Sequence, residues 1–192
     1  MQIRMNISAA SIGALPAWVA PEGYTLRRLE DRDESLLPEL LAAQCPEWAE
    51  PYAPEAMRTY LDLPDRRAGS FVIEHERQIV AACFATRYDE FDPEWGICDY
   101  VWAASRHRGK GLAVGVTGAV LRYFRKAGYK AATLTTLNVD EADHRLSAIK
   151  CYLKLGFRPV CADDNAVVLE TIYNEIDWPL PIGWWQGKTP SP

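Results

Sequence analysis

The stretch VWAASRHRGKGLAVGVTGAV, residues 101–120, decides the fold expected for this chain. It joins a β-rich run, Gly96 to Ala104, to an apolar helical pattern that reaches about Ala127, and Gly128 then marks the helix end. The junction, RHRGKGLA at 106–113, places three Lys or Arg residues and two glycines at a helix start, where backbone N–H groups lack partners and the helix dipole is positive. This pattern is typical of a phosphate-binding loop, although a solvated basic surface loop has the same composition.

The same loop does not fit the other common phosphate motifs. A P-loop needs Gly-x-x-x-x-Gly-Lys-Ser/Thr, and a dinucleotide fingerprint needs a third glycine where this chain has Val114. The sequence also lacks a Gly-x-Ser-x-Gly nucleophile elbow, and its three histidines show neither metal-ligand nor triad spacing. We therefore expect neither a hydrolase nor a metal site.

The composition indicates a globular protein with one full-sized core. Of 192 residues, 48% are hydrophobic and 24% charged, and the longest wholly apolar run, Ile79 to Ala85, is far too short to cross a membrane. Twenty-six acidic residues against 21 Lys and Arg leave a net charge of −5, which disfavours nucleic acid and anionic membranes as partners. Five scattered cysteines without a Cys-x-x-Cys pair fit reduced thiols and a cytoplasmic location.

Alternating strand and helix patterns predict an α/β (α+β) domain with a mixed, largely antiparallel sheet. Strands are expected at 24–29, 70–74, 78–88, 96–104, 131–137, 157–161 and 166–172, and helices within 36–41, 55–61, 112–127 and 146–153. Residues 1–23 are expected to form an arm without the apolar block of a signal peptide, and residues 24–172 the domain. The Trp- and Pro-rich extension 173–192 is too aromatic for a solvated end, so we expect it to pack on the domain or on a partner subunit.

Two segments carry a family resemblance. RGKGLA at 108–113 fits the Gln/Arg-x-x-Gly-x-Gly/Ala signature of the GCN5-related N-acetyltransferase (GNAT) superfamily, and AIKCYLKLGF at 148–157 resembles its Tyr-x-Lys-Leu-Gly-Phe element. In element order the resemblance extends over roughly residues 24–172. It implies a sheet of six to seven strands flanked by about four helices, with the fourth and fifth strands splayed to hold acetyl-CoA.

The resemblance also implies a set of cofactor-binding residues. The fourth strand would pair with the pantetheine arm of acetyl-CoA through its backbone, and the signature loop would hold the phosphates. Asn138, just past the fifth strand, matches a position that hydrogen-bonds the cofactor or the substrate, and a loop-capping Asn is the alternative. Arg145 stands where many relatives have an asparagine. The residues implied are Val101, Trp102, Ala103, Arg108, Gly109, Lys110, Gly111, Leu112, Ala113 and Asn138.

Three residues are candidates for catalysis. By resemblance, Tyr152 would protonate the departing thiolate as a general acid, with a core aromatic as the alternative. Asp99 is the first candidate for the general base, because period-two alternation puts it on the same side of the strand as Val101. A buried ion pair is an equally good explanation for Asp99. Glu94 is the second candidate.

The sequence thus predicts an acetyl-CoA-dependent enzyme that acetylates a primary amine of a small molecule or peptide, by direct attack in a ternary complex. A covalent route through Cys98 or Cys151 is disfavoured, since neither lies in a recognisable cysteine–histidine motif. The alternative is a catalytically silent acyl-CoA-binding module with a protein partner. Homodimers are common in the resembled family, so a homodimer is possible by analogy.

Overall fold

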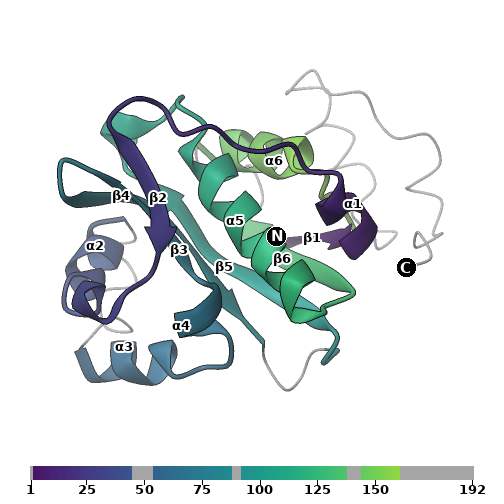
Figure 1. The fold of residues 1–192 in the computed structure, drawn as a ribbon, viewed down its shortest axis with the longest axis horizontal. Coiled ribbons are helices and arrows are strands. Elements are labelled where there is room, and N and C mark those ends of the chain that lie inside the picture. Colours follow the sequence, from purple (N-terminus) through teal and green to yellow (C-terminus); the bar gives the residue numbers. More distant parts are fainter. Residues whose placement is uncertain (1, 45–53, 88–91, 138–143, 161–192) are drawn as a thin grey trace.

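A seven-stranded sheet forms the centre of the protein (Figure 1). The computed structural model describes residues 2–44, 54–87, 92–137 and 144–160. The strand order is β2-β3-β4-β5-β6-β1-β7, and every neighbouring pair is antiparallel except the parallel pair β5–β6. The strands are β1 (Gln2–Ser8), β2 (Tyr24–Arg28), β3 (Phe71–His75), β4 (Gln78–Thr86), β5 (Trp95–Ala103), β6 (Ala131–Leu137) and β7 (Arg158–Pro159). The predicted mixed, largely antiparallel sheet is confirmed.

Six α-helices, among the parts of the chain that the structure describes, pack on this sheet. They are α1 (Ala9–Gly13), α2 (Leu37–Gln44), α3 (Pro54–Leu61), α4 (Arg66–Gly69), α5 (Leu112–Ala127) and α6 (His144–Lys154). One apolar cluster joins the sheet to α1, α5 and α6, and a second joins it to α2 and α3. The apolar run in β4 is explained by this layering, because its side chains from Ile79 onward are buried.

Each long helix ends where the sequence predicted. Gly128 follows α5 with a φ of 93°, and its N–H donates to the carbonyls of Arg125 and Phe124. Gly156 follows α6 with a φ of 88°. Both glycines adopt the left-handed conformation that other residues avoid, so they end their helices by a C-cap. In the ranges 2–44, 54–87, 92–137 and 144–160, every helix is too short or too polar to span a bilayer.

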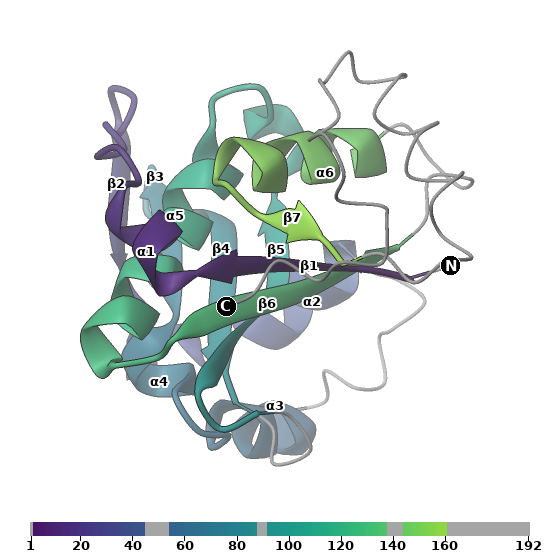
Figure 2. The same ribbon diagram turned by 90° about the vertical axis from the view of Figure 1, so that its right-hand side faces the viewer.

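The N-terminal segment differs from the expected arm. Gln2–Ser8 forms β1, which pairs with β6 along its whole length and with β7 at Met5 and Asn6 (Figure 2). Ile3, Met5 and Ile7 are buried, so a period-two apolar pattern was present in this segment. The polar residues between them face the other side of the strand, so they interrupt the apolar run without preventing a strand. The boundary at residue 23 is therefore wrong for residues 2–13. The predicted strand 166–172 and the extension 173–192 lie outside the described residues.

The parallel pair β5–β6 is short. The two strands pair only from Trp95 and Ala131 to Ile97 and Thr133, although β5 continues to Ala103 and β6 to Leu137. Past Ile97, no strand among the described residues pairs with the edge of β5 that faces β6. The predicted splay between these strands is confirmed, and it positions the candidate site.

Replacing Met5 in β1 tests whether this strand is part of the core. Met5 is fully buried, so Met5→Ala is expected to lower the free energy of unfolding by about 2–5 kcal/mol. Val19 is 82% exposed, and Val19→Ala should change stability by less than about 0.5 kcal/mol. Urea unfolding followed by circular dichroism measures both values. Equal stabilities of the two variants would contradict the central position of β1.

Candidate active site

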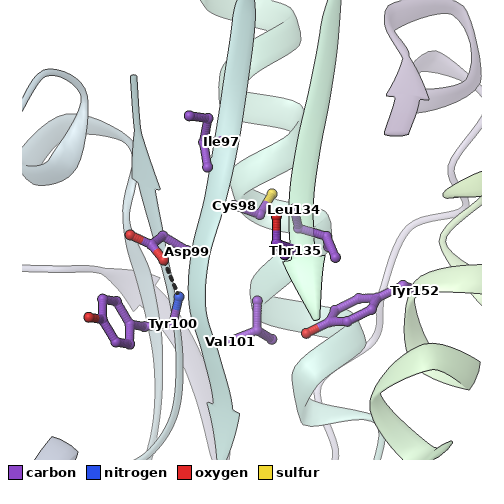
Figure 3. A pocket seen from close by; sticks show the side chains of 8 residues that line it. All are labelled: Ile97, Cys98, Asp99, Tyr100, Val101, Leu134, Thr135 and Tyr152. Carbon is purple, nitrogen blue, oxygen red and sulfur yellow. Dashed lines mark hydrogen bonds between the residues drawn. The ribbon is translucent and has the colours of Figure 1, made fainter. Parts of the chain in front are cut away.

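A cleft opens where β5 leaves β6. It has a volume of about 180 Å³ and lies between these two strands and α6 (Figure 3). Its lining residues are Ile97, Cys98, Asp99, Tyr100, Val101, Leu134, Thr135 and Tyr152. Three of the residues singled out in the sequence, Asp99, Val101 and Tyr152, are thus brought to one cleft.

A β-bulge lies in the middle of β5, beside this cleft. Ala82 of β4 opposes Trp102, and Phe84 opposes Asp99, so the one residue between them on β4 faces both Tyr100 and Val101. Tyr100 has a φ of 43°, the left-handed region that a non-glycine residue rarely occupies. The extra residue shifts the alternation of side chains along the strand.

Because of the bulge, Asp99 and Val101 do not share a side of β5. Val101 packs with the apolar cluster of α5 and α6, whereas Tyr100 packs with the cluster of α2 and α3. Figure 3 shows the side chains of Asp99 and Tyr100 on one side of the strand and that of Val101 on the other. The same-side prediction for Asp99 is therefore wrong. No pattern in the sequence marks a bulge at Tyr100.

The bulge leaves hydrogen-bond donors on the open edge of β5. The N–H of Ala104 donates to the carbonyl of Val80 in β4 at 2.8 Å. Successive N–H groups of a strand point to opposite edges, so those of Val101 and Ala103 point away from β4, toward the splay. Val101 and Ala103 are among the residues that the family resemblance implies for cofactor binding.

The glycine-rich loop precedes α5 as predicted. Gly109 and Gly111 have φ values of 78° and 72°, and Gly111 is the N-cap residue of α5. A glycine has no side chain that could accept the N–H groups of the first turn. A Cβ added to Gly109 would have no atom within 4 Å, and Arg108 and Lys110 are exposed. Backbone N–H groups, the helix dipole and two cations therefore meet at an open surface, which suits a phosphate group.

The loop is held in place by contacts that the sequence did not indicate. Tyr24, the first residue of β2, is hydrogen-bonded through its hydroxyl to Nδ1 of His107 at 2.9 Å. The indole of Trp18 packs on the first turns of α5, so close that a Cβ on Gly115 would lie 2.6 Å from its ring. No sequence pattern indicates a role for these aromatic residues at the loop, because only the fold brings residues 18 and 24 to it.

Tyr152 projects from α6 into the cleft. Its side chain is 6% exposed, and Figure 3 shows its hydroxyl pointing across the cleft toward Val101. Burial raises the pKa of the Tyr152 phenol well above its ordinary value. The phenol therefore keeps its proton at neutral pH, as a proton donor must.

Cys98 and Cys151 are poor candidates for a nucleophile, because both thiols have raised pKa values. Burial, followed by contact with Cys83, raises the pKa of Cys98 well above its ordinary value. Burial also raises the pKa of Cys151 to about 12. Both thiols remain protonated at neutral pH, and only thiolates are good nucleophiles.

The two candidate bases have different surroundings. Asp99 is 26% exposed and its Oδ2 lies 2.5 Å from Nη2 of Arg66, which is completely buried. Glu94 lies before the first residue of β5, is 50% exposed, and pairs with Lys130 Nζ at 2.5 Å. It is not among the residues that line the cleft. Asn138, the third polar residue expected near the site, lies outside the described residues.

The raised pKa of Tyr152 predicts a loss of stability at high pH. The unfolded chain releases the phenol proton near pH 10 whereas the folded protein retains it, so the stabilisation is present below about pH 10 and is lost as the pH rises further. Above pH 10, the unfolding free energy of the wild type should fall faster than that of Tyr152→Phe, by up to about 1.4 kcal/mol per pH unit. Urea unfolding at a series of pH values measures this difference. Parallel curves would contradict the raised pKa.

Comparison with known proteins identifies the family. No curated protein has a significantly similar sequence. The fold resembles GCN5-related N-acetyltransferases from Sphaerobacter thermophilus (20% identity, TM-score 0.64, 82% of this chain and 48% of that chain) and Kribbella flavida (21%, 0.54, 82% and 53%). It also resembles a GNAT-family acetyltransferase from Colwellia psychrerythraea (14%, 0.59, 82% and 52%). The chain thus spans about half the length of these structures. Residues 37–157 match the acetyltransferase (GNAT) family, so the chain belongs to that family.

Proposed function

We propose that this protein transfers the acetyl group of acetyl-CoA to a primary amine of a small molecule or peptide, by direct attack within a ternary complex. Acetyl transfer from acetyl-CoA to amines is the general reaction of the GNAT family. The observation that carries the proposal is the splay of β5 from β6 beside Tyr152: in the part of the chain that the structure describes, the two strands pair at three positions only. Acetyl-CoA supplies a thioester, whose carbonyl carbon accepts the amine nitrogen.

The residues present fit both the phosphate groups and the pantetheine amide groups of acetyl-CoA. Arg108, Gly109, Lys110, Gly111, Leu112 and Ala113 would hold its phosphates at the N-terminus of α5. The backbone of Val101, Trp102 and Ala103 would pair with the amide groups of the pantetheine arm, since the N–H groups of Val101 and Ala103 point to the open edge. We keep Asn138 as a further contact on the basis of its sequence position.

In this proposal the chemistry is divided among three groups. The N–H of Val101 donates to the thioester oxygen as negative charge develops there, an effect worth about 3 kcal/mol for a preorganised donor. Asp99 accepts the proton that the amine loses, directly or through a water molecule. As the carbon–sulfur bond breaks, Tyr152 donates its proton to the departing sulfur. The raised pKa values of Cys98 and Cys151 argue against a covalent acetyl-cysteine route.

Four further proposals rest on the sequence and on analogy with the family. The sequence has an acidic run at Asp89, Glu90, Asp92 and Glu94, so we propose that the amine acceptor is cationic. The five cysteines without a paired motif favour a cytoplasmic location. Packing of the 173–192 extension on the domain or on a partner subunit follows from the Trp-rich composition of that extension. Assembly as a homodimer is proposed by analogy with the family.

Thiol release in the presence of different amines tests the activity. Purified protein is mixed with acetyl-CoA and a panel of polyamines, amino acids, aminoglycosides and peptides with free N-termini. Thiol release that depends on one acceptor class is the expected result. Binding of acetyl-CoA by calorimetry without release from any acceptor would instead favour a silent acyl-CoA-binding module.

Tyr152→Phe separates catalysis from binding. The variant keeps the buried ring but loses the hydroxyl proton, so turnover is expected to fall on the order of 100-fold. Its dissociation constant for CoA should stay close to that of the wild type, because the phosphate loop is unchanged. Unchanged turnover on a verified acceptor would show that Tyr152 is not the general acid.

Gly111 offers a matched pair of variants for the phosphate loop. Aspartate and asparagine have the same shape and both tolerate the left-handed conformation better than other side chains, so they differ mainly in charge. Gly111→Asp should weaken CoA binding about tenfold or more, because a carboxylate there repels the phosphates. Gly111→Asn should retain most of the affinity. Equal affinities in calorimetric titrations would argue against phosphate binding at this loop.

A further inference from the structure

We propose that Arg66 is a positioning residue of the acetyl-transfer site. Through Asp99, Arg66 holds the β5 bulge in the conformation that turns the Val101 N–H toward the cleft. This inference rests on the proposed function for its catalytic consequence, although the contacts that carry it are independent of any substrate.

The Arg66 guanidinium is buried next to Asp99, one of the residues that line the cleft. Its side chain is completely inaccessible, Nη2 lies 2.5 Å from Asp99 Oδ2, and the guanidinium carbon lies 3.8 Å from the centre of the Tyr60 ring. A planar cation can stack on an aromatic ring and donate to a carboxylate at the same time, which lysine cannot do equally well. A buried cation is costly unless such partners surround it, so this arrangement constrains where Asp99 lies.

The backbone that carries Arg66 is itself anchored to α5. Asp65, directly before α4, accepts hydrogen bonds from the hydroxyls of Tyr123 in α5 and Tyr129 just after it. Gly69, at the other end of α4, lies against the Tyr123 ring, where a Cβ would overlap the ring atoms. The short helix is therefore fixed at both ends, and Arg66 projects from a rigid support.

Asp99 passes this constraint to the bulge. Its Oδ2 binds Arg66, and its Oδ1 accepts the N–H of Tyr100 at 3.0 Å, the bond drawn in Figure 3. Tyr100 is the residue with the positive φ, a conformation that persists only where the surroundings enforce it. The Tyr100 ring also packs on the Tyr60 ring at a centroid distance of 5.4 Å. Because Arg66 stacks on the same Tyr60 ring, Tyr60 provides a second connection between Arg66 and the bulge.

The bulge decides the direction of the next N–H group. With the extra residue in β5, the donors of Val101 and Ala103 face the splay, and Asp99 and Val101 lie on opposite sides of the strand. If the bulge relaxed, the alternation would shift by one residue, and the Val101 N–H would turn toward β4. Among the residues proposed to act on the substrates, Arg66 contacts Asp99, and it acts through Asp99 and the bulge.

The test compares Arg66→Gln with Arg67→Gln. Arg67 is the next residue of α4, but it is 43% exposed and pairs with Asp31, Glu34 and Asp62 at the surface. Hydrogen exchange of the Tyr100 amide is measured by NMR on protein without substrate, and acetyl-CoA turnover by thiol release. In Arg66→Gln, exchange should be about tenfold faster and kcat about tenfold lower, with KM for acetyl-CoA changed less than about threefold. Arg67→Gln should match the wild type in all three.

A purely structural role gives a different result. In that case Arg66→Gln lowers the melting temperature, while exchange at Tyr100 and kcat per folded molecule stay at wild-type values, and the proposal is overturned. Arg66→Lys, which keeps the charge, should fall between the wild type and Arg66→Gln in both exchange and kcat.

A second pair of variants serves if Arg66→Gln does not fold. Asp99→Asn keeps an oxygen that accepts the Tyr100 N–H, whereas Asp99→Ala removes it, so only Asp99→Ala should lose the exchange protection of Tyr100. Wild-type exchange in Asp99→Ala would overturn the proposal. If the wild type releases no thiol with any acceptor, the proposed function fails, and the exchange rates alone still decide whether Arg66 holds the bulge.

Discussion

The incomplete pairing of β5 with β6 is the constraint on which the site depends. Two parallel strands of seven or more residues meet at only three pairs and then diverge after Ile97. Backbone N–H and C=O groups need partners, so the open edge of β5 requires water or a ligand with amide groups. An extended pantetheine arm has such groups. The chain continues from the end of β5 at Ala103 through the glycine-rich loop to the N-terminus of α5, and α6 brings Tyr152 to the cleft.

The β5 bulge links the cleft to the other half of the molecule. It divides β5 between the two apolar clusters, so that Val101 packs toward α5 and Tyr100 toward α2 and α3. The Arg66–Asp99 ion pair lies on the second side, supported by α4. The side of β5 that is proposed to bind the cofactor and the side with the buried ion pair are therefore connected through the adjacent residues Tyr100 and Val101. The direction of the Val101 N–H therefore depends on packing in both apolar clusters.

The sequence predicted local elements and the family well, and contacts between distant residues poorly. The loop at Gly109 and Gly111 and the helix end at Gly128 were predicted because each depends on neighbouring residues and on conformations that glycine alone adopts easily. The position of β1 was missed, because a strand's partners are not encoded in its own residues. Asp99 was placed on the wrong side of its strand, because alternation assumes a regular ladder and the bulge breaks it. The catalytic roles of Tyr152 and Asp99 remain predictions.

Amide hydrogen exchange on addition of acetyl-CoA tests the central claim most directly. If the splayed edge of β5 binds the cofactor backbone, the amides of Val101 and Ala103 should exchange at least about tenfold more slowly in the complex. The amide of Ala104, which already donates to Val80, should serve as an internal reference with little change. Saturation with acetyl-CoA that leaves Val101 and Ala103 unprotected would contradict the account, because the cofactor would then bind elsewhere than in the opening between β5 and β6.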